Sequence, residues 1–400
     1  MLYCLFDIAL SSITPAGVFF LPKTEEGERE VKGLKVGRIF KGKANVGRKA
    51  IGILLVVMML SLAGCAQKQA AKNEPAAKNE PVKTVELKLA HFFPATHPVE
   101  TQLVQPWAKA IEQATKGQVK ITSYPMESLL KATEIYGGVK NGIADIGISC
   151  FSYTRGSFPL SEVFELPGIT YNNSKVASRV AWDGIRELNP QEVQDTHLLM
   201  VLTTGPGDLY TKTPVNKLQD IKGMAIRATG LSAETLKTLG ANPVAMPQSE
   251  AYDALSKGLV KGNLGPIEVL QGWKQAEVTK YITKTPFLYN TLFFVTMNKD
   301  KWNELSPETQ QAIDKLNEKF FADVAMGLWD KQNQSALDGA IKENKMETIQ
   351  LSQDEAKRWV ELVTPIQADY VNRMKKQGLD GQKALDLTKS LADKYNRQYK

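Results

Sequence analysis

Along most of this chain, short apolar runs alternate with amphipathic stretches, and this alternation restricts the possible folds more than any other feature. Residues 85–90 (VELKLA), 119–124 (VKITSY) and 144–148 (ADIGI) have the length and composition of strands. Residues 99–114 and 132–140 carry apolar side chains at helical spacing. Strands that alternate with helices form parallel βαβ units, so the first part of the chain predicts an α/β sheet.

The same alternation returns in the middle of the chain. Three apolar runs are separated by two predicted helices, in the order 224–228, 232–239 (helix), 243–246, 248–257 (helix) and 258–265. Two rounds of the pattern predict two α/β domains. Leu292–Met297 (LFFVTM) is strongly apolar, and we expect this strand to cross between the domains.

The C-terminal third carries the start signals of long helices. Ser306 is a predicted N-cap with a proline after it, and apolar residues then recur at helical spacing from Ile313 to Leu328. Residues 352–355 (SQDE) form a capping box before Trp359. We interpret these helices as packing elements.

A leader precedes the α/β region. Ile51–Ala63 is a run of thirteen uncharged residues that follows a basic stretch and leads into Gly64 and Cys65. Because a membrane-spanning helix needs about 20 apolar residues, this run reads as a signal peptide. A Cys directly after Leu-Ala-Gly resembles the lipobox of bacterial lipoproteins, which predicts lipidation of Cys65. The alternative is an ordinary cleavable signal with a chance cysteine.

The segment after Cys65 is polar. Residues 66–81 repeat AAKNEP and have almost nothing to bury, which is typical of a flexible tether. Because signal peptides lie at the start of a protein, we expect translation to begin nearer Val36 or Val46. The predicted organisation is a leader with a lipoprotein signal peptide (1–64), a tether (65–84), domain I (85–204 and 293–332) and domain II with the C-terminal helices (205–292 and 333–400).

The charge of the chain does not favour nucleic acid as a partner. The whole chain has a net charge of +7, with 50 Lys and Arg and 43 Asp and Glu. Residues 1–64 hold 9 and 5 of these, so the remainder carries 41 against 38, or +3. No basic stripe interleaved with aromatic residues is present, so we expect no binding to nucleic acid.

The sequence carries no catalytic or metal-binding motif. Cys150 is the one cysteine after the tether, which excludes a disulfide framework. His91, His97 and His197 lack metal-ligand spacing, and residues 205–207 (GPG) lack the further glycine of a phosphate loop. We therefore expect neither an enzyme nor a cofactor. A lipoprotein enzyme of α/β type stays open as an alternative that turnover of a bound carboxylate would support.

Arg227 is the strongest candidate for a binding residue. It lies at the carboxyl end of the predicted strand 224–228, and a helix begins just after it at Ser232. Ligands of open α/β sheets bind at this edge, and a helix N-terminus favours an anion. A guanidinium grips a carboxylate with two parallel hydrogen bonds. For an isolated arginine, a surface residue at a strand end would be the better interpretation.

A family resemblance changes that balance. From about Val85 to its end, the chain resembles the solute-binding subunit of TRAP transporters (tripartite ATP-independent periplasmic, DctP-type). Six segments carry the resemblance in the family's order: LAHFFPATHP (89–98), LLKATEIYGGVKNGIADIGI (129–148), FPLSEVFELPGI (158–169), LQDIKGMAIR (218–227), LGANPVAMPQSEAYDALSKGLVKG (239–262) and FLYNTLFFVTMNKDKWNELSPETQQAI (287–313).

The resemblance implies both a fold and a function. The fold is an α/β, two-domain, periplasmic-binding-protein-like clamp with crossing strands and long C-terminal helices. The function is the capture of a small organic acid for the membrane permease subunits of a transporter driven by an ion gradient. In that family the arginine at the position of Arg227 binds the ligand carboxylate. Further pocket positions carried over from the family are Phe93, His97, Lys131, Tyr153 and Gln248.

Departures from the family pattern bear on the ligand. Gly207 stands where dicarboxylate-binding and sialic-acid-binding members often have a second arginine, and residues 260–265 (VKGNLG) replace Val-Asp-Gly-x-x-Asn. Fewer polar clamps suit a monocarboxylate, such as a keto, hydroxy or aromatic acid, or a larger apolar ligand. Trp273 and Tyr252 are candidates for an aromatic wall or for core. A C4-dicarboxylate ligand stays open, and so does a tethered sensor that reports to a membrane signalling partner.

Substitution of the lipobox cysteine tests the predicted anchor. Because the Cys65 thiol would carry the lipid, Cys65→Ala should release the protein from membranes or stall its processing. The measurement is the distribution of the protein between membrane and soluble fractions. Unaltered membrane association of the variant would place the anchor elsewhere.

Overall fold

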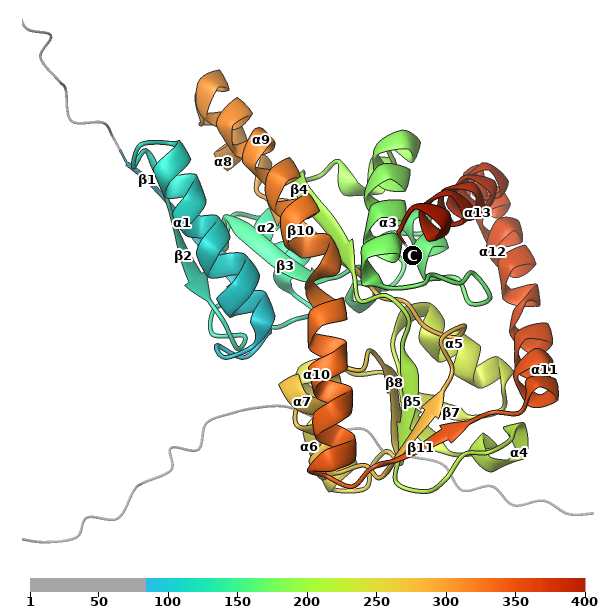
Figure 1. Cartoon of the computed structure of the whole chain (residues 1–400). Coiled ribbons are helices and arrows are strands. Elements are labelled where there is room, and N and C mark those ends of the chain that lie inside the picture. The colour runs from blue at the N-terminus through green and yellow to red at the C-terminus, as the bar shows by residue number, and fades with distance from the viewer. Residues whose placement is uncertain (1–83, 400) are drawn as a thin grey trace, which may run out of the picture. The chain divides into compact units, whose positions relative to one another are not determined.

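The computed structural model describes residues 84–399, and two β-sheets organise them (Figure 1). The first sheet has the strand order β2-β1-β3-β10-β4. β1 pairs in parallel with β2 and β3, whereas β10 is antiparallel to both of its neighbours. Its strands are β1 (Val85–His91), β2 (Val119–Tyr124), β3 (Ile146–Cys150), β4 (His197–Thr203) and β10 (Leu292–Met297).

The second sheet has the order β11-β9-β5-β8-β6-β7. β6 pairs in parallel with β7 and β8, while β5 is antiparallel to β8 and β9. Its strands are β5 (Asp208–Thr211), β6 (Ala225–Arg227), β7 (Asn242–Val244), β8 (Gly262–Gly265), β9 (Tyr281–Lys284) and β11 (Glu347–Gln350). Each sheet with the helices packed on it is called a lobe below, the first lobe around β1 and the second around β6.

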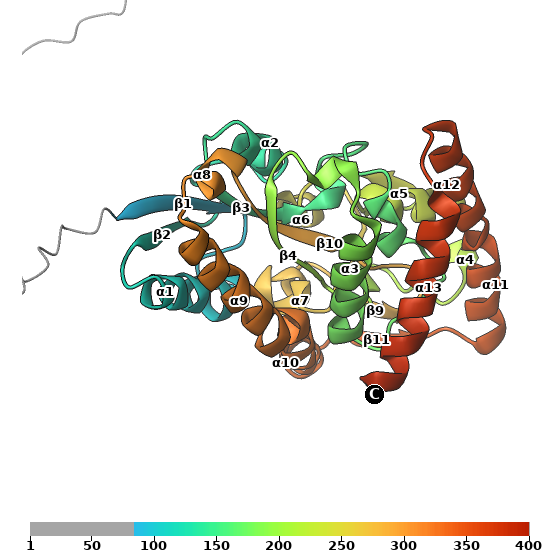
Figure 2. The same cartoon turned by 90° about the horizontal axis from the view of Figure 1, so that it is seen from above.

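Helices connect the strands and cover the sheets (Figure 2). α1 packs on β2, α3 on β4 and α5 on β7, while α10 contacts both α3 and α7. The helices are α1 (Gln105–Ala114), α2 (Ile135–Lys140), α3 (Ser174–Leu188), α4 (Leu218–Ile221), α5 (Gly230–Thr238), α6 (Gln248–Ser256), α7 (Val269–Gly272), α8 (Lys299–Asn303), α9 (Pro307–Asp323), α10 (Leu328–Lys342), α11 (Gln353–Val363), α12 (Pro365–Lys376) and α13 (Gly381–Gln398). In 84–399, no helix is long and apolar enough to span a membrane.

The predicted elements are present, and the differences lie at their ends. Residues 99–104 form a π-helical segment before α1, so the expected helix at 99–114 is α-helical in its second part alone. α2 starts at Ile135 rather than at Ala132, whose backbone N–H donates to Glu127 Oε1. Both serines are N-caps, since the Ser306 and Ser352 hydroxyls accept hydrogen bonds from the backbone N–H three residues on. The capping box expected at 352–355 is present only in this half, because Glu355 Oε1 accepts from Leu218 and Trp359 instead.

The chain crosses between the sheets just outside the strand expected to do so. β10 pairs along its whole length with β4, from Leu292 opposite Thr203 to Met297 opposite His197, and therefore lies inside the first sheet. Two short crossings fall at residues 204–207, between β4 and β5, and at residues 285–291, between β9 and β10. A third, longer connection runs from β10 through α8, α9 and α10 to β11 in the second sheet.

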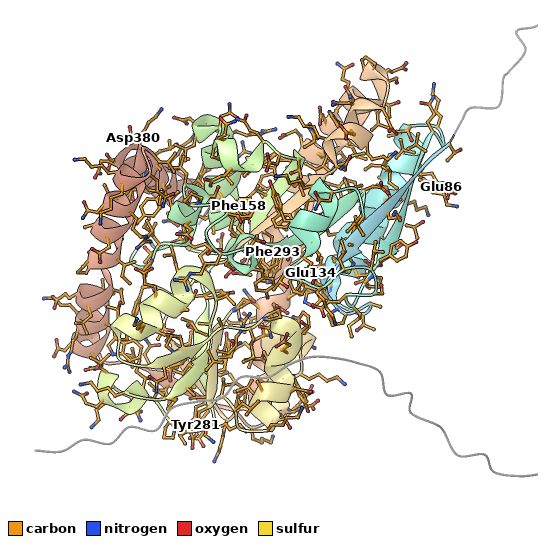
Figure 3. All side chains as sticks on the ribbon, turned by 180° about the vertical axis from the view of Figure 1, so that it is seen from behind. Glu86, Glu134, Phe158, Tyr281, Phe293 and Asp380 are labelled. Carbon is orange, nitrogen blue, oxygen red and sulfur yellow. The ribbon has the colours of Figure 1, made fainter. Side chains whose placement is uncertain are left out.

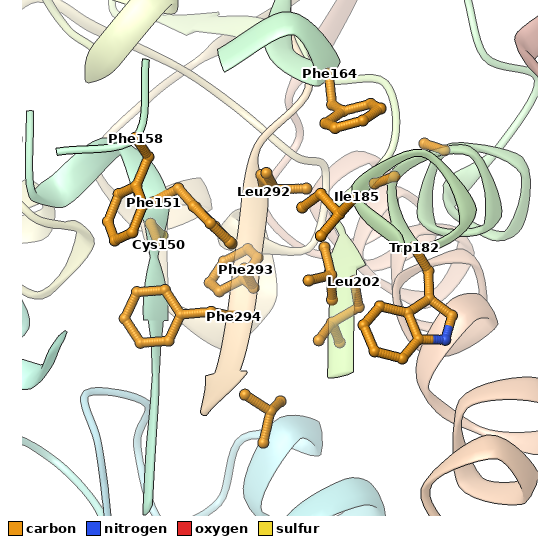
Figure 4. Packing of buried hydrophobic residues seen from close by; sticks show 14 of the residues in the cluster. Cys150, Phe151, Phe158, Phe164, Trp182, Ile185, Leu202, Leu292, Phe293 and Phe294 are labelled. Atoms are coloured by element: carbon orange, nitrogen blue, oxygen red, sulfur yellow. The ribbon is translucent and has the colours of Figure 1, made fainter. Parts of the chain in front are cut away.

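β10 divides its side chains between two environments, because successive residues of a strand face opposite sides of the sheet. Figure 4 shows β10 between β3, which carries Cys150, and β4, which carries Leu202. Phe294 packs edge-on against Phe151, with ring centroids 5.4 Å apart. Phe293 faces the other way and stacks on Trp329 at 5.2 Å. One face of β10 thus fills the core and the other reaches the junction of the lobes.

The C-terminal helices return from the second lobe to the first. α11 contacts α5, whereas α13 packs along α3, as Figure 2 shows. Residues 333–400 thus contact both lobes. The exact division of the chain into two domains stays a prediction.

A buried carboxyl group accepts a hydrogen bond from the first residue of β10. Glu165 is 5% exposed, and its Oε1 accepts a hydrogen bond of 2.7 Å from the backbone N–H of Leu292. Burial raises the pKa of Glu165 to about 8, because the low-dielectric interior disfavours its charged form. The folded protein therefore holds this proton more tightly than the unfolded chain, in which the pKa is 4.5.

The raised pKa predicts a pH-dependent stability. The contribution of Glu165 is fully present below pH 4.5 and is lost as the pH rises through about 8, because the folded state must then ionise a buried group. Glu165→Gln should flatten the fall in unfolding free energy between about pH 5.5 and about pH 8.5. Urea unfolding at the two pH values measures it, with Glu112→Gln on the exposed face of α1 as control. Equal slopes for Glu165→Gln and wild type would contradict the assignment.

Candidate functional site

A small cavity lies where the lobes meet. Its volume is about 20 Å³, roughly the space that one water molecule needs. The first lobe supplies Phe93, Tyr153 and Phe293, and Figure 3 labels Phe293 between Glu86 of the first lobe and Tyr281 of the second. The lining residues are Phe92, Phe93, Cys150, Tyr153, Thr204, Arg227, Thr229, Gln248, Pro266, Glu268, Val269, Trp273, Tyr289, Thr291 and Phe293. Side chains from both lobes therefore enclose it.

Arg227 brings a positive charge to this cavity from the end of β6. Its side chain is buried, with 3% of the residue exposed. Nε donates to Met246 O at 3.0 Å, Nη1 to Asn263 Oδ1 at 3.4 Å and Nη2 to Tyr153 Oη at 3.3 Å. Within residues 84–399, no acidic group lies within ion-pair distance of the guanidinium. A buried cation without a counter-charge is costly, so this position favours an anionic ligand.

The backbone next to Arg227 also favours a negatively charged ligand. α5 begins at Gly230, so its N-terminal N–H groups lie close behind β6 and favour negative charge. Gly230 has a φ of 53°, and a Cβ there would meet Ser152 Cβ of the first lobe at 2.7 Å. A glycine is needed because of the positive φ and because a side chain here would meet the other lobe.

Within residues 84–399, several hydrogen-bond donors around the cavity lack a partner. Tyr153 Oη accepts from the backbone N–H of Gln248 at 2.8 Å and from Arg227, so its own proton stays available to a ligand. Burial raises the pKa of Tyr153 well above its usual value and keeps that proton in place. Gln248 Nε2 and Trp273 Nε1 are buried donors without a partner in the described part of the chain. Such donors call for an acceptor, which a carboxylate supplies.

Aromatic rings form the walls of the cavity. Phe92 and Phe93 stack with ring centroids 4.3 Å apart, and Trp273 lies 6.0 Å from Phe92. Phe293 is 5.7 Å from Phe93, and Tyr153 is 5.4 Å from Phe92. A site with one cationic end and aromatic walls suits a carboxylate that has a flat apolar body.

Two histidines fix the loop that carries Phe92 and Phe93. His91 Nδ1 accepts a hydrogen bond from the backbone N–H of Phe93, so its Nε2 carries the proton and donates to Glu100 at 2.7 Å. Burial opposes ionisation of Glu100, but hydrogen bonds, first that from His91, outweigh it and hold its pKa below the usual value. This pair lies wholly in the first lobe.

His97 uses the same arrangement to join the lobes. Its Nδ1 accepts from the backbone N–H of Val99 at 3.1 Å, and its Nε2 donates to Glu268 Oε2 at 3.0 Å. Glu268 follows β8 of the second lobe, so this hydrogen bond crosses between the lobes. The imidazole lies behind Phe93, 4.7 Å from its ring, rather than on the cavity wall.

The structure brings together four of the six predicted binding residues. Phe93, Tyr153, Arg227 and Gln248 line the one cavity. Lys131 does not join them, because its side chain is 70% exposed and pairs with Glu127 at 3.6 Å. His97, as described above, lies one layer behind.

The other aromatic and lipid-anchor candidates are placed as follows. Trp273 lines the cavity, whereas Tyr252 lies away from it and donates a hydrogen bond to Glu277. Cys65, with the leader and the tether to residue 83, lies outside the described residues.

Three contributors were not foreseen. Phe293 was expected only as part of the crossing strand. Glu268 lies in an otherwise apolar stretch, and a lone acidic residue shortly after a strand is the signal that could have identified it. The sequence has Gly265 where the family pattern has an asparagine. Asn263, however, is fully buried beside Arg227 and donates to Gln275 Oε1 at 2.9 Å. The amide is present, two positions from where the family pattern has one.

Gly207 has no room for a side chain. A Cβ at this position would meet Gly265 O at 2.3 Å and Tyr289 Cδ1 at 2.4 Å. Both distances are shorter than real Cβ contacts, and one of the two atoms belongs to the backbone. The packing of this crossing segment therefore excludes an arginine at position 207.

Comparison with known proteins links this geometry to a family. The family described as bacterial extracellular solute-binding protein, family 7 (DctP), matches residues 89–373. The chain is 26% identical over 304 residues to the outer membrane transporter protein TsaT of Comamonas testosteroni, with 74% of this chain and 88% of that protein covered. It is 27% identical over 273 residues to the C4-dicarboxylate-binding periplasmic protein DctP of Rhodobacter capsulatus, with 66% and 80% covered.

Two solved structures share the fold. A TRAP solute-binding protein from Rhodoferax ferrireducens T118, in complex with copurified benzoate, has a TM-score of 0.74 and 27% identity, with 79% of this chain and 100% of that chain covered. A marine metagenome TRAP solute-binding protein specific for aromatic acid ligands, in complex with metahydroxyphenylacetate, has a TM-score of 0.74 and 30% identity, with 78% and 99% covered.

Proposed function

This chain belongs to family 7 of the bacterial extracellular solute-binding proteins, the TRAP solute-binding family for small organic acids, and we propose that its ligand is a monocarboxylate with an aromatic body. The protein would capture this acid outside the cytoplasm and deliver it to the membrane permease subunits of a TRAP transporter driven by an ion gradient. A lipid on Cys65 would hold it at the membrane.

The observation that carries the proposal is Arg227, a buried guanidinium without an acidic partner in the described chain. A single bound carboxylate would supply the missing counter-charge and accept the free donors of Tyr153 and Gln248. The aromatic rings around it favour a flat apolar body. The benzoate and metahydroxyphenylacetate held by the two related structures fit that description.

A C4-dicarboxylate is the second candidate, because one relative is named for such ligands. A second carboxylate would need a second cation, and Arg227 is the one cationic side chain among the described residues that line the cavity. The other charged group of the lining is acidic, Glu268, which would repel a second carboxylate. Gly207 leaves no room for an arginine. These features support the monocarboxylate over the dicarboxylate.

A sensor that reports ligand to a membrane signalling partner would use the same clamp. The genes beside this one distinguish the two roles, since adjacent genes for two membrane permease subunits favour transport. Catalysis is not needed for either role, and the family consists of binding receptors.

Replacement of Arg227 tests the site. Charge-assisted hydrogen bonds contribute about 1.5 to 3 kcal/mol each, so Arg227→Ala should abolish measurable binding of benzoate and related acids. Arg227→Lys should also bind poorly, because an ammonium cannot reproduce the planar fork. A thermal-shift screen of organic acids measures this, since a ligand at 100 times its Kd stabilises by about 2.7 kcal/mol.

The exposed Lys131 provides the matched control, and Lys131→Ala should bind like wild type. In the same screen, monocarboxylates should give larger shifts than succinate, malate or fumarate. Normal binding by Arg227→Ala would refute the site. A screen in which the dicarboxylates alone gave shifts would instead refute the monocarboxylate.

Closure of the lobes is a separate prediction. The cavity of about 20 Å³ is too small for an aromatic acid, so the lobes must separate to admit one and then close around it. Saturating ligand should therefore reduce the radius of gyration in small-angle X-ray scattering. Arg227→Ala with the same acid is the control and should show no such reduction. Identical wild-type profiles with and without ligand would count against a clamp.

A further inference from the structure

The cavity has an acidic end as well as a cationic one. Glu268 lines it, is 4% exposed, and lies outside ion-pair distance of Arg227. Two opposite charges that share an enclosure without pairing leave each available to a different part of a ligand. A carboxylate satisfies Arg227 but gives nothing to Glu268.

The surroundings of Glu268 fix its orientation. Its Oε2 accepts the hydrogen bond from His97, and its backbone N–H donates to Asn333 Oδ1 at 3.0 Å. Gly272 lies against the hydrogen-bonded pair of His97 and Glu268 and leaves no room for a side chain, since a Cβ there would meet Glu268 Oε2 at 2.7 Å. The second carboxylate oxygen, Oε1, makes no hydrogen bond within residues 84–399. Glu268 is therefore a positioned side chain with one unused acceptor, on a residue that lines the cavity.

A second, independent observation lies at the other end of α7. Trp273 Nε1 is buried, lines the same cavity, and has no hydrogen-bond partner in the described chain. Indole can only donate, and a carboxylate can only accept. A ligand group that serves both must donate one hydrogen bond and accept another. A hydroxyl does so, whereas an ammonium has no lone pair and an ether or halogen has no proton.

We propose that Glu268 and Trp273 form a specificity site for a hydroxyl group, so that the ligand is a hydroxylated aromatic monocarboxylate. The ligand hydroxyl donates to Glu268 Oε1 and accepts from Trp273 Nε1, while its carboxylate binds Arg227. His97 is a positioning residue, because it acts through Glu268. The inference rests on the proposed function, since it presupposes a carboxylate on Arg227.

The test compares benzoate with its three hydroxybenzoate isomers and with the corresponding fluorobenzoates, by isothermal titration calorimetry. Fluorine is close to a hydroxyl in size but cannot donate. For wild type, at least one hydroxy isomer should bind about tenfold more tightly than benzoate and than its fluoro counterpart, as expected for a hydrogen bond to a charged acceptor. This ratio of dissociation constants is the hydroxyl gain.

Glu268→Gln keeps an acceptor for His97 but removes the charge, so the hydroxyl gain should fall to about threefold or less, because a neutral hydrogen bond is about half as strong. Trp273→Phe keeps a ring and removes the donor, and it should lower the gain independently. Glu165→Gln makes the same change at a buried carboxyl that does not line this cavity, and it should keep the full gain. Circular dichroism confirms that each variant is folded.

An undiminished gain in both Glu268→Gln and Trp273→Phe would overturn the inference. So would a wild type in which no hydroxy isomer binds better than its fluoro isomer. If benzoate binds and Arg227→Ala abolishes that binding, the proposed function stands even when the hydroxyl gain is absent. A wild type that binds none of these acids would overturn both.

Discussion

The organisation of the site follows from one constraint, the burial of the Arg227 guanidinium without an acidic partner in the described chain. Isolated charges are expensive inside a protein, and here neutral groups alone soften the cost. Met246 O, Asn263 Oδ1 and Tyr153 Oη each accept one of its hydrogen bonds. These acceptors hold the guanidinium in place without neutralising it. The carboxylate of a bound ligand would supply the missing counter-charge.

The fold delivers this charge through ordinary α/β geometry. Parallel strands place their carboxyl ends at one edge of a sheet, and Arg227 is the last residue of β6. Tyr153 follows β3 of the first lobe at the corresponding edge of the other sheet. Because short segments at residues 204–207 and 285–291 cross between the sheets beside these strands, the two edges face each other. The topology of the two sheets therefore determines where the cavity lies, and the side chains then line it.

Sequence reasoning reached the parts of the site that depend on local pattern. A strand end followed by a helix, together with the family resemblance, predicts Arg227, and the resemblance predicts Phe93, Tyr153 and Gln248. The structure places these four residues on one cavity. Lys131 was misplaced relative to the cavity because a turn residue can point either way, and Glu127 holds it outside. Glu268 was not foreseen because its partner His97 is 171 residues away in sequence. Contacts between lobes leave no periodic trace in a sequence.

The nature of the contacts between the lobes explains how an enclosed site can still exchange its ligand. Tyr153 reaches Arg227 and Gln248, His97 reaches Glu268, and Ser249 donates to Glu127 across the junction. In the open state water can replace each of these hydrogen bonds, so the net contribution of each to closure is about 0.5 to 1.5 kcal/mol for a neutral pair and about 1.5 to 3 kcal/mol where one partner is charged. A bound carboxylate adds charge-assisted bonds to a guanidinium that is fully enclosed when the lobes are closed. A ligand therefore shifts the equilibrium toward the closed state by as much as it binds that state more tightly than the open one, which is the property a reversible carrier requires.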